Sequence, residues 1–112
     1  MREKAKAQAG MLYDANFDEE LLKERAAAKE LLYEINHLRP SQHSDKDRLY
    51  KKLIGKLGER FLIESPFHCD YGYNIEIGDD FYANVNLVIL DGAKVKIGDH
   101  VFIAPNVGLY TA

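Results

Sequence analysis

Aliphatic residues recur every six positions between residues 75 and 112, and this repeat constrains the fold more than any other feature of the chain. One series comprises Ile77, Ala83, Ile89 and Val95, and it restarts after a slip of two residues as Ile97, Ile103 and Leu109. A companion series lies four residues further on, at Phe81, Leu87, Ala93, Val101 and Val107. A period of six matches neither the 3.6-residue turn of a helix nor simple strand alternation. It is typical of a chain wound as a triangular coil, in which every side is a short strand.

Small and polar residues occupy the predicted corners of this coil. Gly78-Asp79 and Gly98-Asp99 follow inward-pointing isoleucines, and a left-handed backbone costs least for Gly, Asn and Asp. Each coil takes about three sixes, so residues 75–112 form about two coils. No capping element follows the last coil in this sequence, and an uncapped end exposes apolar surface and strand edges. We therefore expect either that the chain is a fragment or that another chain covers this end.

The half of the chain before the repeats predicts three helices, over residues 2–13, 18–37 and about 44–57. The second is the clearest, because an apolar stripe at helical spacing runs along it, made of Leu21, Ala28, Leu32 and Ile35. Phe61 to Ile63 reads as a first strand. We therefore predict an α+β chain, with a helical N-terminal segment over residues 1–58 and a parallel β-solenoid over residues 59–112.

Composition excludes several classes of function. The net charge is −3 and no basic run is dense enough for nucleic-acid binding. No apolar run approaches the ~20 residues of a membrane span, and the N-terminus lacks the apolar core of a secretion signal. A single cysteine, Cys69, fits a reducing compartment. The expected location is the cytoplasm.

Several motifs together carry a family resemblance over the whole chain. The N-terminal half contains Ala9-Gly10, Leu12-Tyr13, Leu22, Glu24-Arg25, Ala28, Leu31 and Asn36. The segment Phe67–Gly78 reads FHCDYGYNIEIG, and it is followed by Asn84, Leu90-Asp91, Ile97-Gly98-Asp99, Ala104-Pro105-Asn106-Val107 and Tyr110-Thr111-Ala112. The chain thus resembles the maltose and galactoside O-acetyltransferases of the hexapeptide-repeat acyltransferase superfamily, and is most similar to the maltose branch. The resemblance implies a left-handed parallel β-helix, assembled as a homotrimer with active sites between neighbouring subunits.

The resemblance also implies the reaction, which is transfer of acetyl from acetyl-CoA to a hydroxyl of maltose, glucose or a related sugar. Such a transfer needs a general base for the hydroxyl and hydrogen-bond donors for the oxyanion. In the family the base is a histidine directly after the Tyr-Thr-Ala segment, and this sequence ends at Ala112. We therefore expect that these 112 residues lack the base and most of the coenzyme A contacts, and resemble the N-terminal part of the enzyme.

On the acceptor side, the resemblance implies contacts to the sugar from two aspartates. Asp14 matches a sugar-binding aspartate of the family, and carboxylates accept hydrogen bonds from paired hydroxyls. It also reads as a turn residue after a short helix. Asp70 stands where some relatives have a serine that contacts the sugar. Its alternative role is to bond loop amides.

Three further residues complete the predicted site. Asn84 matches a family asparagine that orients the reacting hydroxyl or assists the oxyanion, although an asparagine is also common at solenoid corners. Tyr82 could form a wall against a pyranose face. Asp91 aligns beside another family carboxylate, and that contact is lost here if Gly92 is the true equivalent.

Two other functions stay open. A non-catalytic trimeric module could bind sugar or serve as structure without the catalytic histidine. A metal-dependent hexapeptide-repeat enzyme would need three histidines from neighbouring coils, whereas only His68 and His100 lie in or near the solenoid, so we expect no metal. His100 reads as a solvated corner residue. Cys69 reads as a small buried hydrophobe rather than a nucleophile.

Overall fold

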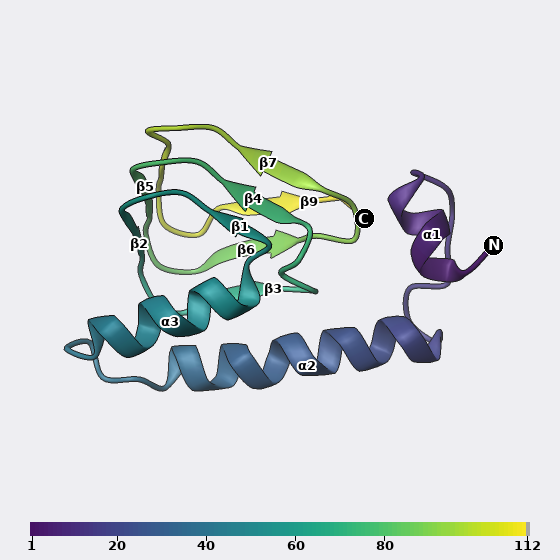
Figure 1. Ribbon diagram of the computed structural model, residues 1–112, viewed down its shortest axis with the longest axis horizontal. Coiled ribbons are helices and arrows are strands. Elements are labelled where there is room, and N and C mark those ends of the chain that lie inside the picture. Colours follow the sequence, from purple (N-terminus) through teal and green to yellow (C-terminus); the bar gives the residue numbers. More distant parts are fainter. Residues whose placement is uncertain (112) are drawn as a thin grey trace.

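Within residues 1–111, which the computed structural model describes, three helices precede nine short strands (Figure 1). The helices are α1 (Glu3–Gln8), α2 (Glu19–Asn36) and α3 (His43–Leu53). The strands are β1 (Lys56–Leu57), β2 (Phe61–Ile63), β3 (Phe67–Cys69), β4 (Ile75–Ile77), β5 (Phe81–Ala83), β6 (Leu87–Leu90), β7 (Val95–Ile97), β8 (Phe102–Ile103) and β9 (Gly108–Tyr110). This order confirms the predicted α+β class.

The strands stack into three parallel sheets, with the orders β1-β4-β7, β2-β5-β8 and β3-β6-β9. Each strand pairs with the strand one full coil away, so that Glu76 lies between Lys56 and Lys96. A coil therefore takes 20 residues, two more than three sixes. The two extra residues lie in the corner that leads from the third side into the next coil.

This longer corner explains the slip in the six-residue pattern. Val95 pairs with Ile75, and Ile97 pairs with Ile77. The predicted place of Val95 in the series of Ile77 was therefore wrong, because the slip falls before Val95 and not after it. Ala93 lies in the corner between β6 and β7 and belongs to neither strand.

The solenoid has one coil more than the repeats predict. Residues 75–110 form two coils as expected, and β1, β2 and β3 form a further coil before them. Strands β2 and β3 lie within the predicted range of residues 59–112, and β1 lies just before it. The helix predicted over residues 44–57 was too long, since α3 ends at Leu53 and Ile54 has an extended backbone. Gly55 then lies so close to the Tyr73 carbonyl that a side chain would collide with it. This close approach brings β1 into register with β4.

Local backbone signals fix the ends of the first two helices. The helix predicted over residues 2–13 stops at Gln8, because Gly10 adopts a φ of 74° and the chain turns away. Asp18 caps α2, with its carboxylate accepting from the backbone N–H of Leu21 at 3.0 Å. The predicted apolar stripe of α2 is buried along its whole length.

The interior of the prism is apolar and is closed at one end by helices. The inward residues of the middle coil are at most 3% exposed, and they are Ile75, Ile77, Phe81, Ala83, Leu87 and Ile89. Helices α2 and α3 lie side by side across the first coil (Figure 1). The buried ring of Tyr50 from α3 meets Phe61 and Phe67 edge-on, with centroids 6.3 Å and 5.8 Å away. The helices thus supply the N-terminal cap of the solenoid.

The corners after β4 and β7 have a left-handed residue, but it is not part of Gly78-Asp79 or Gly98-Asp99 as predicted. It is the residue that directly follows each pair. Asp80 and His100 have φ values of 56° and 59°, and Arg60 has 52° at the equivalent place in the first coil. Gly78 serves a different purpose, because a side chain there would collide with the backbone of Gly98 in the next coil. Glycine at this corner therefore permits close stacking of the coils.

His100 should be a site where a substitution stabilises the chain. Asparagine tolerates a left-handed backbone better than histidine, and the ion pair of His100 with Asp80 is exposed and contributes little. His100→Asn is expected to raise the free energy of unfolding by about 0.5 kcal/mol, measured by urea titration. The reverse change Asn106→His, at a φ of 62°, should lower it. Equal effects of the same sign would contradict this explanation.

Candidate acceptor site

The predicted site residues fall into two groups at opposite ends of one face of the prism. Asp70 follows β3 and Asp91 follows β6, so both lie at the carboxyl end of the sheet β3-β6-β9. Asn84 follows β5 and therefore lies at the corner before β6, at the other end of that sheet. Because β6 has four residues, these two ends are roughly 13 Å apart.

Asp14 lies in an exposed loop between α1 and α2. Its Oδ1 accepts from the backbone N–H of Phe17 at 3.3 Å, and its own N–H donates to Oε2 of Glu3 at 3.3 Å. The hydrogen bond from Phe17 is typical of an aspartate in a turn. Asp14 therefore has the alternative role predicted for it, that of a turn residue. The sugar contact remains a prediction.

The loop of Asp14 packs against the long corner after β6. The hydroxyl of Tyr13 lies where a side chain at residue 92 would project, so Tyr13 would have to move to admit one at Gly92. Lys4 of α1 holds the same region from outside, since its Nζ lies 2.9 Å from Oε1 of Glu24 and 4.7 Å from the ring centre of Tyr73. Asp14 is thereby held at the end of the prism that carries Asp70.

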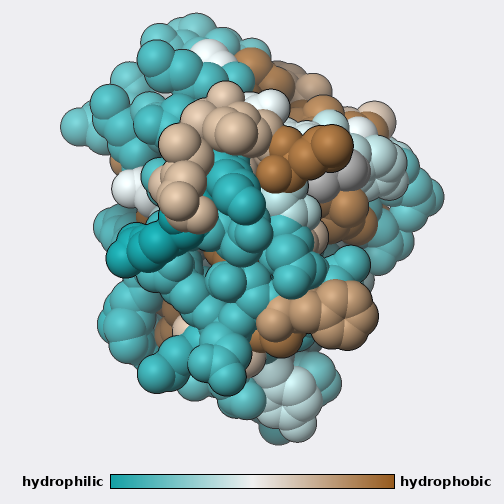
Figure 2. All heavy atoms as spheres, turned by 90° about the vertical axis from the view of Figure 1, so that its right-hand side faces the viewer, coloured by the Kyte–Doolittle hydropathy of each residue, from teal (hydrophilic) through white to brown (hydrophobic). Residues whose placement is uncertain are grey.

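A pocket of about 430 Å³ lies beside this loop. Its size is within the range of small-molecule sites. Eight residues line it: Ala7, Gly10, Met11, Leu12, Tyr13, Ala15, Ala93 and Thr111. The surrounding surface has apolar side chains in the open, with Leu12 98% and Phe17 82% exposed. Figure 2 shows such apolar side chains among hydrophilic ones at the end of the molecule that carries α1.

Asp91 is fully buried and serves the backbone of the neighbouring coil. Its Oδ1 accepts from the N–H groups of Asp70 and Tyr71 at 3.1 Å and 2.9 Å. Its Oδ2 accepts from those of Gly72 and Asn74 at 2.8 Å and 3.3 Å. Burial raises the pKa of Asp91, and the hydrogen bonds from these amides oppose that rise. With 0% exposure the carboxylate has no surface to offer a sugar, so a substrate contact by Asp91 does not fit these contacts.

The alternative role predicted for Asp70, bonding loop amides, is thus performed by Asp91 instead. Asp70 itself is only partly buried, and its backbone rather than its side chain is engaged with Asp91. No residue next to Asp91 in the sequence indicates that it binds these amides. The signal lies in the 20-residue coil, which stacks residue 91 directly beside residues 70–74.

Tyr82 and Asn84 belong to the second group. Tyr82 points outward from β5, in register with Leu62 and Phe102, and its ring meets that of Phe102 edge-on at 6.3 Å. Leu62 is 45% and Phe102 76% exposed, so this outer face is apolar and open. Asn84 is partly buried, and its Oδ1 accepts from the N–H of Val85 at 2.8 Å. Its amide nitrogen is the group placed to donate.

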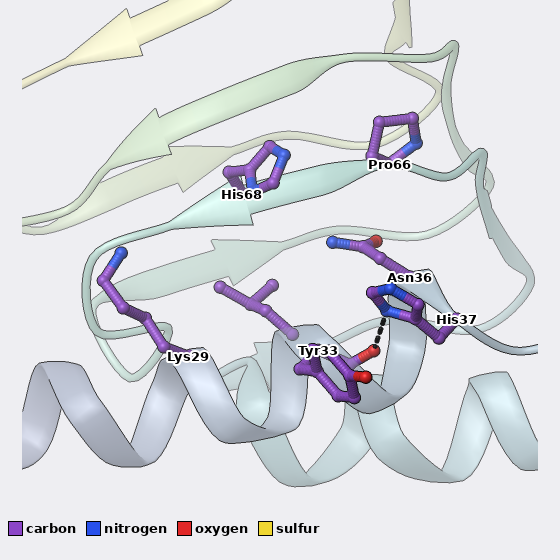
Figure 3. A pocket seen from close by; sticks show the side chains of 7 residues that line it. Lys29, Tyr33, Asn36, His37, Pro66 and His68 are labelled. Atoms are coloured by element: carbon purple, nitrogen blue, oxygen red, sulfur yellow. Dashed lines mark hydrogen bonds between the residues drawn. The ribbon is translucent and has the colours of Figure 1, made fainter.

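A groove of about 420 Å³ lies between α2 and β3, and none of the predicted site residues lines it. Lys29, Tyr33 and His37 line it from the helix, and Pro66 and His68 line it from the first coil (Figure 3). Asn36, which is part of the family resemblance, has a structural role. Its side-chain amide donates to the carbonyl of Phe67 at 2.9 Å and accepts from the N–H of Phe67 at 3.0 Å.

Cys69 has the buried position that was predicted for it. Cys69 is 3% exposed, and burial raises the pKa of its thiol, which keeps it neutral. Across residues 1–111, no three His, Cys, Asp or Glu side chains gather as they would around a metal ion. In the same residues, no helix is both long and apolar enough to cross a membrane.

Comparisons with known proteins agree over the whole chain. Residues 6–58 match the maltose acetyltransferase hexapeptide capping motif. A Saccharomyces cerevisiae protein with the provisional name of an acetyltransferase is 60% identical over 103 residues. The match covers 92% of this chain and 53% of that protein. A maltose O-acetyltransferase from Clostridium difficile superposes with a TM-score of 0.97 at 41% identity, covering 100% of this chain and 59% of the other.

A galactoside acetyltransferase in complex with coenzyme A is also similar, with a TM-score of 0.92 and 42% identity. The match covers 98% of this chain and 55% of that protein. The chain therefore spans between about half and three fifths of the length of the proteins it matches. Ala112, the last residue of the family motif, lies outside the described residues.

Proposed function

The chain belongs to the hexapeptide-repeat acetyltransferases with a left-handed parallel β-helix and a maltose-acetyltransferase capping motif, and from this membership we propose that the protein acetylates a sugar. The acetyl donor is acetyl-CoA, and the acceptor is a hydroxyl of maltose, glucose or a related sugar. The observation that carries the proposal is the agreement with a maltose O-acetyltransferase over 100% of this chain. One buried cysteine in a chain of this class supports a cytoplasmic location.

The proposed transfer is direct and passes through a ternary complex. The sugar hydroxyl attacks the thioester carbonyl, a C–O bond forms, the C–S bond breaks, and the proton of the hydroxyl ends on the sulfur of coenzyme A. The family resemblance assigns the general base to a histidine that follows the Tyr-Thr-Ala segment. Asp14 and Asp70 accept hydrogen bonds from sugar hydroxyls. Asn84 donates its amide N–H to the reacting oxygen or to the oxyanion.

The separation of the two groups supports a site shared by two copies of the chain. Asp70 and Asn84 lie at opposite ends of one sheet, roughly 13 Å apart, which is too far for one sugar ring to touch both. Apolar side chains flank each group, with Leu12 beside Asp14 and Phe102 beside Tyr82, and both are largely exposed. Exposed apolar surface of this kind is typical of an interface. We therefore propose a homotrimer in which neighbouring copies each supply half of the acceptor site.

Release of coenzyme A tests the proposal. The native protein with acetyl-CoA is expected to release free thiol rapidly when maltose or glucose is added, and slowly without a sugar. A panel that adds a galactoside and a primary amine separates sugar acceptors from other nucleophiles. Sugar binding without any thiol release would favour the non-catalytic sugar-binding alternative. Release with the amine alone would overturn the proposed substrate class.

A further inference from the structure

We propose that Asp91 is a positioning residue of the acceptor site, which acts by fixing the direction in which Asp70 presents its carboxylate. This inference rests on the proposed function, in which Asp70 binds the sugar. Asp91 reaches Asp70 through the backbone, since its Oδ1 lies 3.1 Å from the N–H of Asp70. It has no exposed surface, so any effect on the sugar must pass through the residues that it holds.

The contacts of Asp91 immobilise the whole corner that carries Asp70. One carboxylate accepts from four N–H groups within residues 70–74, at 2.8–3.3 Å. Asn74 returns a bond from its side-chain amide to the carbonyl of Asp91 at 2.8 Å. Gly72 completes the turn with a φ of 87°, pressed against the carbonyl of Leu53. The backbone of this corner has little freedom to rotate, so the Cα–Cβ bond of Asp70 has a fixed direction.

The next coil shows that the corner can be turned without such a carboxylate. Thr111 lies 20 positions after Asp91, against the equivalent corner between β6 and β7. Its Oγ1 accepts one N–H, from Ala93 at 2.9 Å, and donates to the carbonyl of Leu90 at 2.7 Å. A single hydroxyl is thus sufficient for the fold of this corner type. The corner in which four N–H groups donate to Asp91 is the one that carries Asp70, a residue predicted to bind the sugar.

Aspartate is the side chain that this arrangement requires. Both of its oxygens accept hydrogen bonds, whereas asparagine would turn an amide NH₂ toward two of the four N–H donors. Asp91→Asn is nearly the same size, so it disturbs the hydrogen bonds more than the packing. The corner should then loosen, and Asp70 should lose its preset direction.

A double-mutant cycle on the full chain tests the inference, with maltose and glucose affinity as the readout. Asp91→Asn is expected to weaken sugar binding about tenfold. In the Asp70→Ala background the same change should have less than about a twofold effect, because the residue it positions is gone. Equal weakening in both backgrounds would overturn the proposal, since a general structural defect would not depend on Asp70.

Two measurements guard against a variant that fails to fold. Asn74→Ala keeps the carboxylate and removes the side-chain bonds to the carbonyls of Asp91 and Gly92, so a weakening of about threefold, again confined to chains with Asp70, is expected. Amide hydrogen exchange should show protected N–H groups at residues 70, 71, 72 and 74, with faster exchange there in Asp91→Asn and unchanged exchange in β6. Unprotected amides in the wild-type chain would overturn the proposal.

The failure of the proposed function looks different. If the wild-type protein binds neither maltose, glucose nor a galactoside, the proposed acceptor class is wrong and the positioning role falls with it. If the wild-type protein binds sugar and the two substitutions act independently, only the role of Asp91 is wrong.

Discussion

Asp91→Ala is expected to lower the free energy of unfolding by about 4 kcal/mol, because it leaves three buried N–H groups and one partly buried N–H group without an acceptor. Such a loss is large for a single substitution and is characteristic of broken buried networks. Guanidinium titration measures it, with an unchanged m-value indicating the same extent of unfolding.

Thr111→Ala is the matched control for this prediction. It removes the side chain that serves the equivalent corner one coil later, where one N–H and one carbonyl are involved and the residue is exposed. The expected loss is about 1 kcal/mol. If both variants lose a similar free energy of unfolding, the four hydrogen bonds of Asp91 add no stability beyond those of Thr111, and our explanation of the corner is wrong.

Asn84→Ala should have the largest effect on catalysis among the described residues. Loss of a donor to the oxyanion commonly lowers kcat by about 10², and we expect a fall of this size in acetyl transfer to maltose or glucose. The KM of acetyl-CoA should change little, because the proposed role of Asn84 concerns the reacting oxygen. Steady-state release of coenzyme A measures both constants.

Asn86→Gly provides the control for Asn84. Asn86 lies two residues further along the same corner, is exposed, and has a φ of 65° that glycine adopts freely. Its side chain only donates to Oδ1 of Asn106 at 2.9 Å. We expect activity within about twofold of wild type. A wild-type kcat in Asn84→Ala, or an equal loss in Asn86→Gly, would remove Asn84 from the proposed site.

Much of the solenoid could be predicted from the six-residue period, because inward residues must be apolar in every coil. The same argument would have found the first coil. Leu57, Ile63 and Cys69 are six apart and stack on Ile77, Ala83 and Ile89. Ile63 does lie in the strand predicted over residues 61–63, but Leu57 also continues the helical spacing of α3, so the first coil is not recognised as a whole from the sequence. The helix predicted as far as residue 57 is prevented by the close approach of Gly55 to Tyr73, which is visible only in the folded structure.

The contacts of Asp91 could not be predicted in the same way. Its partners lie 17–21 positions earlier in the chain, and nothing in the neighbouring Leu90 or Gly92 indicates them. They come together only when the coils are stacked with the longer corner in place. The sequence resemblance aligned Asp91 near a family carboxylate, but burial rather than alignment decides what an aspartate can touch.

The proposed division of the acceptor site between two copies of the chain does not follow from composition or from the six-residue period. Asp70 and Asn84 are 14 positions apart in the sequence, yet β6 lies between their corners and keeps them at opposite ends of a sheet. In the proposed function, a site for a single sugar ring that uses both therefore draws each from a different copy. This requirement makes the shared acceptor site the central claim about the protein.

Complementation between two inactive variants tests that claim most directly. Asp70→Ala and Asn84→Ala are coexpressed with different tags, mixed oligomers are isolated, and acetyl transfer to maltose is measured. Each shared site needs Asp70 from one copy and Asn84 from its neighbour, so one site in three is intact in every mixed trimer, and the isolated mixed oligomers should have about a third of wild-type activity. If both residues act within one copy, every site in the mixed oligomers stays defective. Activity no higher than that of the separate variants would contradict the account.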